Sequence, residues 1–361
     1  MLHQMILQEE NITLLLNCSC LGCEMDENKI SAVTGWQLNS YTFHTVRAKI
    51  FMDCSGDSIL AELSGAAYRV GRESRDEFGE YAAPDVADSY TMGSSCLIEA
   101  RKTDHPCTFI PPQWAYTYPD DESMYLKNHD IIGTGVNFWW IELGGEDDTI
   151  LDGQRINEEL LRMAYGVWDH IKNHGDHGAE NWELEWVGFL PGKRESRRYV
   201  GDYIMTQNDV RAEGRFDDLI AYGGWSMDDH HPAGIATKES PNIFHPAPSP
   251  YGIPYRSLYS KNVSNLMFAG RNISVTHAAL SSSRVMATCA VLGQALGTAV
   301  AQSIFENVHI ENVDIKKLQQ TLMQDDCYMI SSGGWTVQLY TPQPASKKSD
   351  DKKKEKKAAT P

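Results

Sequence analysis

Two short apolar segments, each ending at a glycine before a helix-like stretch, most constrain the fold of this chain. The first is Ile50–Gly56, which leads into residues 57–65, and the second is Asn265–Gly270, which leads towards residues 282–305. A glycine at such a turn lets a ligand approach the backbone, and the following helix offers unpaired N–H groups at its N-terminus. That arrangement suits a pyrophosphate or a developing anion. Similar turns also join strands to helices in many α/β proteins without binding a ligand.

The size and charge of the chain argue against several classes of protein. Its 361 residues predict about two domains, with a core large enough to fold without disulfides or metals. Acidic residues outnumber basic ones 49 to 32, and the net charge of −17 argues against a nucleic-acid partner. No run of about 18 apolar residues occurs, so we expect no membrane span. The first residues do not resemble a signal peptide, which predicts a cytoplasmic location.

The hydrophobic pattern predicts a mixture of strands and helices. Strands are expected at residues 12–17, 30–38, 41–46, 48–53, 134–142, 182–190, 199–205 and 265–270. Helices are expected at residues 57–65, 149–173, 282–305 and 314–325. The second helix carries one apolar stripe made of Leu160, Ala164, Val167 and Ile171. The third is apolar on most faces, which predicts that it lies inside the protein.

Five blocks of sequence follow one another in an order typical of a known family. They are Phe51–Ala66, Arg194–Asp202, Gly224–Gly234, Ile253–Leu258 and Asn265–His277, the last continuing to Ser283–Met286 and Gly293–Ala295. The first block contains D-C-S-G-D at residues 53–57, where the family usually has D-A-T-G-D. The chain thus resembles the FAD-dependent oxidoreductases related to the heterodisulfide reductase A flavoprotein. It is more distantly similar to the succinate dehydrogenase and fumarate reductase flavoproteins.

The resemblance implies an α/β fold with an α+β insertion. Residues 1–75 and 255–330 would form an incomplete Rossmann-like FAD-binding domain, and residues 76–254 would form a β-rich substrate domain. The tail at residues 345–361 contains seven Lys and no large apolar side chain, so we expect it to be disordered. The implied activity is oxidation of a small organic or carbohydrate-like molecule by hydride transfer to flavin.

One departure from the family pattern concerns the cofactor. Such proteins normally open with a strand, the motif G-x-G-x-x-G and a helix, and this turn receives the FAD pyrophosphate. The motif is absent here, since Gly133 and Gly135 precede no helix and Gly293 and Gly297 fall within one. We therefore interpret the chain as truncated at its N-terminus, or as completed by a second chain, and expect it to bind FAD poorly alone. A non-catalytic fragment or subunit of a two-chain flavoprotein is the first alternative.

The resemblance also implies which residues contact the cofactor. Ser55, Gly56 and Asp57 would lie near the nucleotide, and Gly270 and Arg271 would form the last flavin-contacting turn. The implied set is completed by three residues further along the chain, Ser274, His277 and Arg284. A helix N-terminus and an arginine could stabilise negative charge on reduced flavin. For Arg284, a surface ion pair is the other interpretation.

Two histidines and two arginines are the candidate catalytic residues. His230 and His231 stand beside Asp228 and Asp229, and histidine is the usual acid or base near neutral pH. In a strand, Arg194 and Arg198 would share a face, with Arg197 pointing away, and could hold a carboxylate. The alternatives are histidines that cap loop backbone and arginines that pair with nearby carboxylates.

Three cysteines lie close together near the start of the chain, at positions 18, 20 and 23. They could be ligands of an iron–sulfur cluster, and the chain would then be an electron-transfer subunit of the heterodisulfide reductase type. A fourth ligand at matching spacing is missing, and a turn after the strand 12–17 that happens to carry thiols is the simpler explanation. We therefore assign no metal ligands from the sequence.

Overall fold

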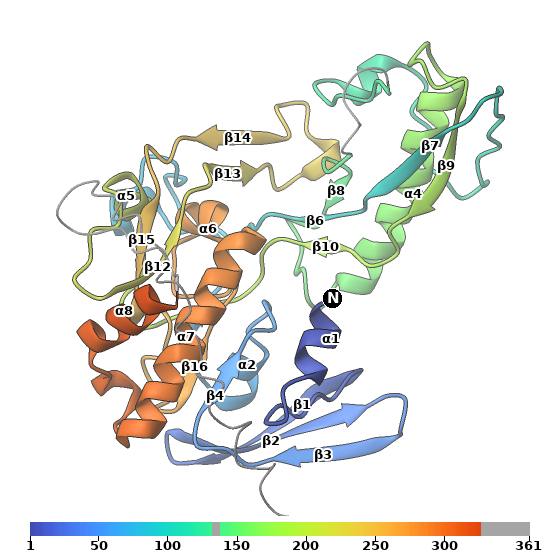
Figure 1. The fold of residues 1–361 in the computed structure, drawn as a ribbon. Coiled ribbons are helices and arrows are strands. Elements are labelled where there is room, and N and C mark those ends of the chain that lie inside the picture. Colours follow the sequence, from blue (N-terminus) through green and yellow to red (C-terminus); the bar gives the residue numbers. More distant parts are fainter. Residues whose placement is uncertain (132–137, 326–361) are drawn as a thin grey trace, which may run out of the picture. The chain divides into compact units, whose positions relative to one another are not determined.

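Two parallel strands from distant parts of the chain lie side by side (Figure 1). The computed structural model describes residues 1–131 and 138–325. In it, β4 (Phe51–Asp53) pairs with β16 (Leu266–Phe268), and Phe268 lies opposite Asp53. Five of these six residues are buried, so both strands read as apolar runs, as expected for parallel pairs. The expected strands at 48–53 and 265–270 are confirmed, in shorter form.

A three-stranded antiparallel sheet precedes this pair in the chain. It consists of β1 (Cys18–Asp26), β2 (Lys29–Gln37) and β3 (Thr42–Val46), with the short helix α1 (Leu2–Leu7) before it. The strands expected at 30–38 and 41–46 are confirmed as β2 and β3. The strand expected at 12–17 is wrong, because Ile12, Leu14 and Leu16 are exposed and Asn17 takes a left-handed φ of 52°.

Helix α2 (Ile59–Ser64) follows β4 and ends where the sequence predicts. Its C-cap is Gly65 with φ 74°, a conformation that glycine adopts without strain. The strand β5 (Tyr68–Arg69) and the helix α3 (Arg75–Phe78) come next. The expected helix at 57–65 is therefore confirmed, shortened at its start by the turn around Gly56.

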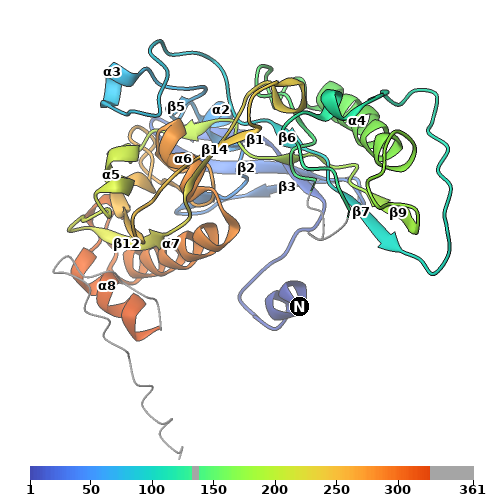
Figure 2. The same ribbon diagram turned by 90° about the horizontal axis from the view of Figure 1, so that it is seen from above.

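The fold has two apolar cores, and the smaller one, called the second core here, forms around α4 (Gly153–Asn173). The sequence predicts this helix at 149–173. Its stripe of Leu160, Ala164, Val167 and Ile171 is almost fully buried, as expected. This helix packs against β9 (Trp182–Val187), which pairs with β7 (Ile98–Lys102), and Figure 2 shows the three elements together. Three two-residue strands connect this region to the rest of the fold: β6 (Ser94–Ser95), β8 (Glu142–Leu143) and β10 (Gly192–Lys193).

The first and larger core is built mainly from the C-terminal third of the described chain. Its strands are β11 (Arg198–Tyr199), β12 (Leu219–Gly223), β13 (Met227–His230) and β15 (Tyr251–Pro254), and β14 (Asn242–His245) pairs with β13 outside the core. Its helices are α5 (Gln207–Arg211), α6 (His277–Ser283), α7 (Met286–Glu306) and α8 (Ile315–Gln324). The last of these confirms the helix expected at 314–325. The described residues form one compact unit that contains both cores.

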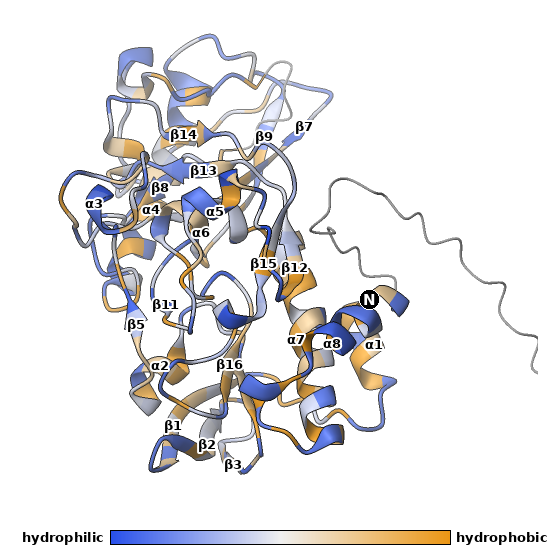
Figure 3. Ribbon diagram, turned by 90° about the vertical axis from the view of Figure 1, so that its left-hand side faces the viewer, coloured by the Kyte–Doolittle hydropathy of each residue, from blue (hydrophilic) through white to orange (hydrophobic). Residues whose placement is uncertain are grey.

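The helix expected at 282–305 is two helices, and it is not fully enclosed. The break lies between Ser283 and Met286, where Val285 is extended with a ψ of 146°. One face of α7 packs against β12 and α8, while Met286 and Phe305 are about nine-tenths exposed. Figure 3 shows apolar colouring along this helix. Among the described helices, α7 alone has the length and hydropathy of a membrane span, and 39% of its apolar window is buried in the fold.

The remaining expectations from the sequence concern two strands, the C-terminal tail and the division into domains. The strand expected at 199–205 is wrong beyond Tyr199, since only Arg198–Tyr199 joins a ladder and Met205 makes an isolated bridge. Residues 134–137 of the strand expected at 134–142 lie outside the described residues, and of its other five residues only Glu142 is in a strand, β8. The whole tail 345–361 also lies outside the described residues. The division into a cofactor domain and a substrate domain stays a prediction.

Candidate functional site

The two glycine turns lie side by side because β4 and β16 are neighbouring parallel strands. Gly56 comes three residues after β4, and Gly270 comes two residues after β16. A side chain at Gly56 would meet the guanidinium of Arg271, whose Nη1 lies 2.6 Å from the place of its Cβ. Gly56 also has a φ of 76°, so close approach and backbone conformation both require glycine there.

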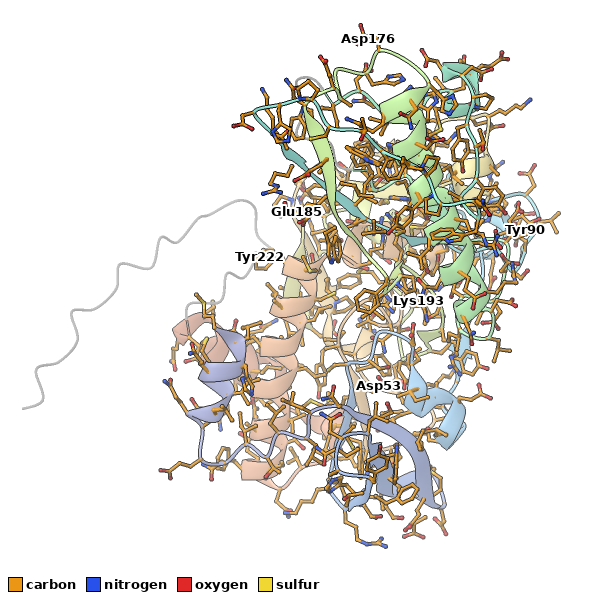
Figure 4. The ribbon with its side chains drawn as sticks, turned by 90° about the vertical axis from the view of Figure 1, so that its right-hand side faces the viewer. Asp53, Tyr90, Asp176, Glu185, Lys193 and Tyr222 are labelled. Atoms are coloured by element: carbon orange, nitrogen blue, oxygen red, sulfur yellow. The ribbon has the colours of Figure 1, made fainter. Side chains whose placement is uncertain are left out.

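Asp57 connects the two turns electrostatically. One carboxylate oxygen accepts hydrogen bonds from Arg271 at 2.9 Å and from Ser196 Oγ at 2.7 Å, and the other accepts one from Lys193 Nζ at 2.9 Å. Burial disfavours its charge, but the hydrogen bonds from Lys193 and Ser196 outweigh burial, and the pKa of Asp57 is lowered. Figure 4 shows Lys193 and Asp53 in this region. Sequence reasoning missed Lys193 and Ser196, which come from a segment more than 130 residues away.

The first turn is held in shape by Asp53, the last residue of β4. Its carboxylate accepts backbone N–H groups of Ser55 at 2.8 Å and Leu60 at 3.0 Å, and the hydroxyl of Tyr199 at 2.6 Å. Burial and the nearby Asp53 raise the pKa of Tyr199 far above its usual value, so this phenol stays a donor. Asp53 therefore fixes the turn and the start of α2.

Backbone near the second turn is open to a ligand. Gly270 has a φ of 121°, and a Cβ there would meet only Asn272 Oδ1, at 3.2 Å. The N-terminus of α7 has no side-chain cap, and Met286 in its first turn is exposed. Burial raises the pKa of Cys289 in that helix, and nearby Arg271 partly offsets this effect. An uncapped helix start beside an arginine favours an anion.

Ser274 follows the second glycine turn and was predicted to contact the cofactor. Its side chain is fully buried. Its backbone N–H donates to Ser257 and its carbonyl accepts from Met205. Gly201 packs against its Cβ, and its hydroxyl has no hydrogen-bond partner among the described residues. Its surroundings are therefore protein backbone.

His277, the first residue of α6, is clamped between two carboxylates. Its Nδ1 donates to Glu195 Oε2 at 2.8 Å, and its Nε2 donates to Asp229 Oδ1 at 3.0 Å. Burial alone would lower the pKa of this imidazole, but the two carboxylates together raise it to about 10. His277 is therefore a fixed cation near neutral pH and a poor proton acceptor.

Arg194 and Arg198 do not share a face, contrary to expectation. The predicted alternation fails because residues 194–197 are not in a strand. Arg198 is buried, where its Nη1 donates to Glu73 at 3.1 Å and to the Val275 carbonyl at 3.1 Å. Arg197 turns instead to Glu62 and to the Asp57 carbonyl. Arg198 is thus paired with carboxylates, the alternative that the sequence left open.

The residues around Asp57 form a first polar cluster, and a second polar cluster brings His230 together with both Arg194 and Arg284. His230 Nδ1 donates to Glu142 Oε2 at 2.7 Å, and Arg194 Nη1 lies 3.2 Å from the same oxygen. Arg284 donates to the carbonyl of Asp228 at 3.1 Å. Burial, and then the charge of Arg194, lower the pKa of Arg284, so the two guanidinium groups act on each other. Two of these residues were predicted catalytic and one cofactor-binding.

Several buried polar atoms in this second cluster have no hydrogen-bond partner among the described residues. They are Arg194 Nη1, Arg284 Nε and Glu142 Oε1. Leaving such atoms unpaired costs about 1–3 kcal/mol each. A polar molecule that carries both acceptors and donors would satisfy these atoms if it reached them.

His231 lies apart from that cluster. Its Nδ1 accepts the backbone N–H of Ala233 at 3.1 Å, and its Nε2 is 3.9 Å from Glu239. The ring is about a third exposed. His231 therefore caps loop backbone, which is the alternative that the sequence left open for His230 and His231.

Cavities border the first turn on two sides. One, of about 520 Å³, is lined by Tyr68, Thr149, Ser196 and Arg197 among others, next to the partners of Asp57. A smaller one, of about 260 Å³, runs along β4 and is lined by Cys20, Met52 and Cys54 among others. Sequence reasoning pointed to neither, because their walls come from separate segments.

The three early cysteines lie within β1 and not in a turn. A bulge between Cys20 and Gly22 places Cys18, Cys20 and Cys23 opposite Gln37, Gly35 and Val33, and therefore on one face. Cys20 and Cys23 pack against the larger core. Burial raises the pKa of both thiols, which favours the protonated form over the thiolate that binds metals.

Comparison with known proteins identifies the family. A family model described as FAD dependent oxidoreductase matches residues 1–322. Searches of curated proteins and of solved structures found no significant match. The match spans both glycine turns and both polar clusters, and it supports the expected oxidoreductase class. The chain therefore belongs to the FAD-dependent oxidoreductase family.

Proposed function

We propose that this chain binds FAD at the joined glycine turns and oxidises a small organic substrate by hydride transfer to the flavin. The observation that carries the proposal is the pairing of β4 with β16, which brings Gly56 and Gly270 to one edge. We also propose, from the five sequence blocks, that it belongs with the relatives of heterodisulfide reductase A.

The residues at this edge fit an anionic cofactor. Ser55, Gly56, Gly270 and Arg271 would line it, and the uncapped start of α7 would face its negatively charged part. Arg271 is suited to this task because it is anchored to Asp57 while its buried Nε has no hydrogen-bond partner among the described residues. FAD, when bound, supplies the hydride acceptor.

An open strand edge supports completion of the cofactor site by another segment. Among the described strands, β4 pairs only with β16, and Met52 in its middle is 45% exposed. Parallel sheets are rarely stable as two strands with an open edge. We propose that a strand carrying the pyrophosphate turn joins β4, supplied by adjoining coding sequence or by a second chain.

His230 is the proposed proton acceptor. Glu142 accepts from Nδ1–H at 2.7 Å, and Nε2, which has only a long contact of 3.4 Å with Asp228 Oδ2, is the nitrogen that would face a substrate. In this arrangement Nε2 takes the proton of a substrate hydroxyl or acidic C–H. His277 cannot replace it, because the two carboxylates hold it in the charged form.

Arg194 and Arg284 are the proposed substrate-binding residues. Their guanidinium groups are close enough that Arg194 lowers the pKa of Arg284. Each has a buried nitrogen without a hydrogen bond to the described residues, although Arg194 Nη1 lies 3.2 Å from Glu142 Oε2. A carboxylate placed between them would accept from both and relieve their mutual repulsion. The pair therefore favours a small carboxylic acid among the possible organic substrates.

The test is a measurement of bound flavin followed by its reduction. The chain is expressed with any adjoining coding sequence of its gene, and flavin released on denaturation is quantified; we expect about one FAD per chain. Anaerobic mixing with a panel of hydroxy acids and polyols should then bleach the flavin. Absence of flavin in every preparation would remove the proposal. Flavin that no small molecule reduces would favour the non-catalytic subunit.

A further inference from the structure

Four ligating side chains converge beside the C-terminal end of α4, outside the sites described above. They are Asp121, His129, His170 and His177, and their ligating atoms all lie within 4.8 Å of one another. Nε2 of His170 and Nε2 of His177 are each 3.5 Å from Asp121 Oδ1, and that of His129 is 3.8 Å away. His170 and His177 are at least 95% buried, and neither Nε2 has a hydrogen-bond partner in the described chain.

The opposite nitrogen of each ring is fixed by an acceptor. Nδ1 of His129 donates to the Lys127 carbonyl at 2.6 Å, and Nδ1 of His170 donates to the Tyr118 carbonyl at 2.8 Å. Nδ1 of His177 donates to Asp130 at 3.0 Å. Because carbonyl and carboxylate oxygens only accept, each Nδ1 carries a proton, and each ring points its Nε2 into the cluster. Metal-binding histidines are held in the same way.

The spacing of the four atoms matches a tetrahedral metal site. Zinc binds histidine nitrogen and carboxylate oxygen at about 2.0–2.2 Å, which separates neighbouring ligand atoms by about 3.3–3.6 Å. The three distances to Asp121 Oδ1 are already close to this value. A small inward movement of the rings would complete the coordination.

We propose that Asp121, His129, His170 and His177 form a structural zinc site. Imidazole and carboxylate ligands suit zinc, and four protein ligands leave no open position for a substrate. His170 lies in the last turn of α4, where the helix dipole favours a cation. The metal would tie the segment around Asp121 to this helix and so close one end of the second core.

The zinc site is separate from the proposed flavin site. Figure 4 shows Asp176, the neighbour of His177, far from Asp53 in the first turn. Because a projection never exaggerates separation, the two sites are distant within the compact unit of the described residues. The aromatic contacts among the rings, with centroids 4.6–4.9 Å apart, give the competing explanation of a plain packing cluster.

The test is the metal content of the full chain, purified without chelators. We expect about one zinc per chain by elemental analysis, and cobalt substitution should give the visible bands of a tetrahedral site. Asp121→Asn should weaken zinc binding at least about 10-fold, and Asp130→Asn should weaken it by about 10–100-fold. Asp121 has a side chain that is 74% exposed, so its variant is not expected to impair folding.

The matched control is His105→Gln, which alters an exposed histidine paired with Asp104 at 2.7 Å. It should keep the full zinc content and the cobalt spectrum. Absence of stoichiometric metal, with no tetrahedral cobalt spectrum on reconstitution, would overturn the proposal in favour of a packing cluster. Equal zinc affinity in Asp121→Asn and the wild type would also overturn it.

Discussion

The two polar regions of the larger core are built in opposite ways. The turn region is made by two local segments, and its key residues lie within six positions of β4 or β16. The buried region around His277 and His230 is formed by side chains that lie far apart in the sequence, among them Glu73, Glu142, Glu195 and Asp228. The first is held by backbone hydrogen bonds to Asp53 and by partly exposed ion pairs of Asp57, and the second by buried charge pairs.

This difference predicts which region tolerates change. The turn region is partly open to solvent, since the Asp57 side chain is about a third exposed, so screening weakens its ion pairs. The buried region has no such screening, and removing one partner there leaves an uncompensated charge. We therefore expect stability to depend on the buried region and cofactor binding to depend on the turns.

The largest expected effect on stability is that of Glu195→Gln. Glu195 accepts from His277 and from the Met92 N–H, and its other oxygen lies 3.4 Å from Arg198. Its neutralisation should lower the free energy of unfolding by about 3–5 kcal/mol, measured by denaturant titration. Glu24→Gln, which breaks an exposed pair with Arg47, is the control and should leave the unfolding midpoint unchanged. Equal effects of the two variants would refute the distinction.

A comparable effect on turnover is expected for His230→Asn. Loss of the proton acceptor should slow flavin reduction about 10²–10⁴-fold at unchanged flavin content, measured by anaerobic stopped-flow. His231→Asn should change the rate little, because that ring caps Ala233. A larger loss in His231→Asn than in His230→Asn would reverse the assignment.

The buried region also predicts a pH dependence of stability. The pKa of His277 is raised from 6.5 to about 10 in the folded chain, so its contribution is complete below pH 6.5. The contribution is then lost as the pH rises through about 10. Unfolding free energies between these limits should fall with pH, and His277→Gln should flatten that part of the curve. An unchanged slope in the variant would show that other groups cause it.

The smallest effect is expected for Asp57→Asn. Three hydrogen bonds to Asp57 are weakened, but partial exposure reduces the cost to about 1 kcal/mol in thermal or denaturant unfolding. Because the folded state lowers the pKa of Asp57, the wild type should lose this stability as the pH falls through that pKa. A cost as large as that of Glu195→Gln would erase the contrast between the regions.

The sequence predicted local features well. The strands at β4 and β16, the Gly65 cap of α2 and the buried stripe of α4 follow from residue type and spacing within one segment. The pairing of the two glycine turns was inferred from family resemblance, since no local pattern encodes a contact across more than 200 residues.

The polar partners were largely out of reach of the sequence. Lys193 and Ser196 reach Asp57 only through tertiary packing, and Glu142 reaches His230 from a separate strand. The histidines near α4 gave no signal either, because their spacing along the chain matches no short metal motif. The break at Val285 was missed because the apolar pattern continues across it.

The most direct test of the central claim is the flavin content of two matched glycine variants. Gly270 and Gly65 both have positive φ, at 121° and 74°, and a Cβ at either position meets little. Valine at either position strains the backbone, because both φ values are positive, but only Gly270 lies at the proposed flavin edge. We predict that, expressed with any adjoining coding sequence, the otherwise unchanged protein and Gly65→Val carry about one FAD per chain and that Gly270→Val loses most of it. Equal flavin content in Gly270→Val and Gly65→Val would contradict the account.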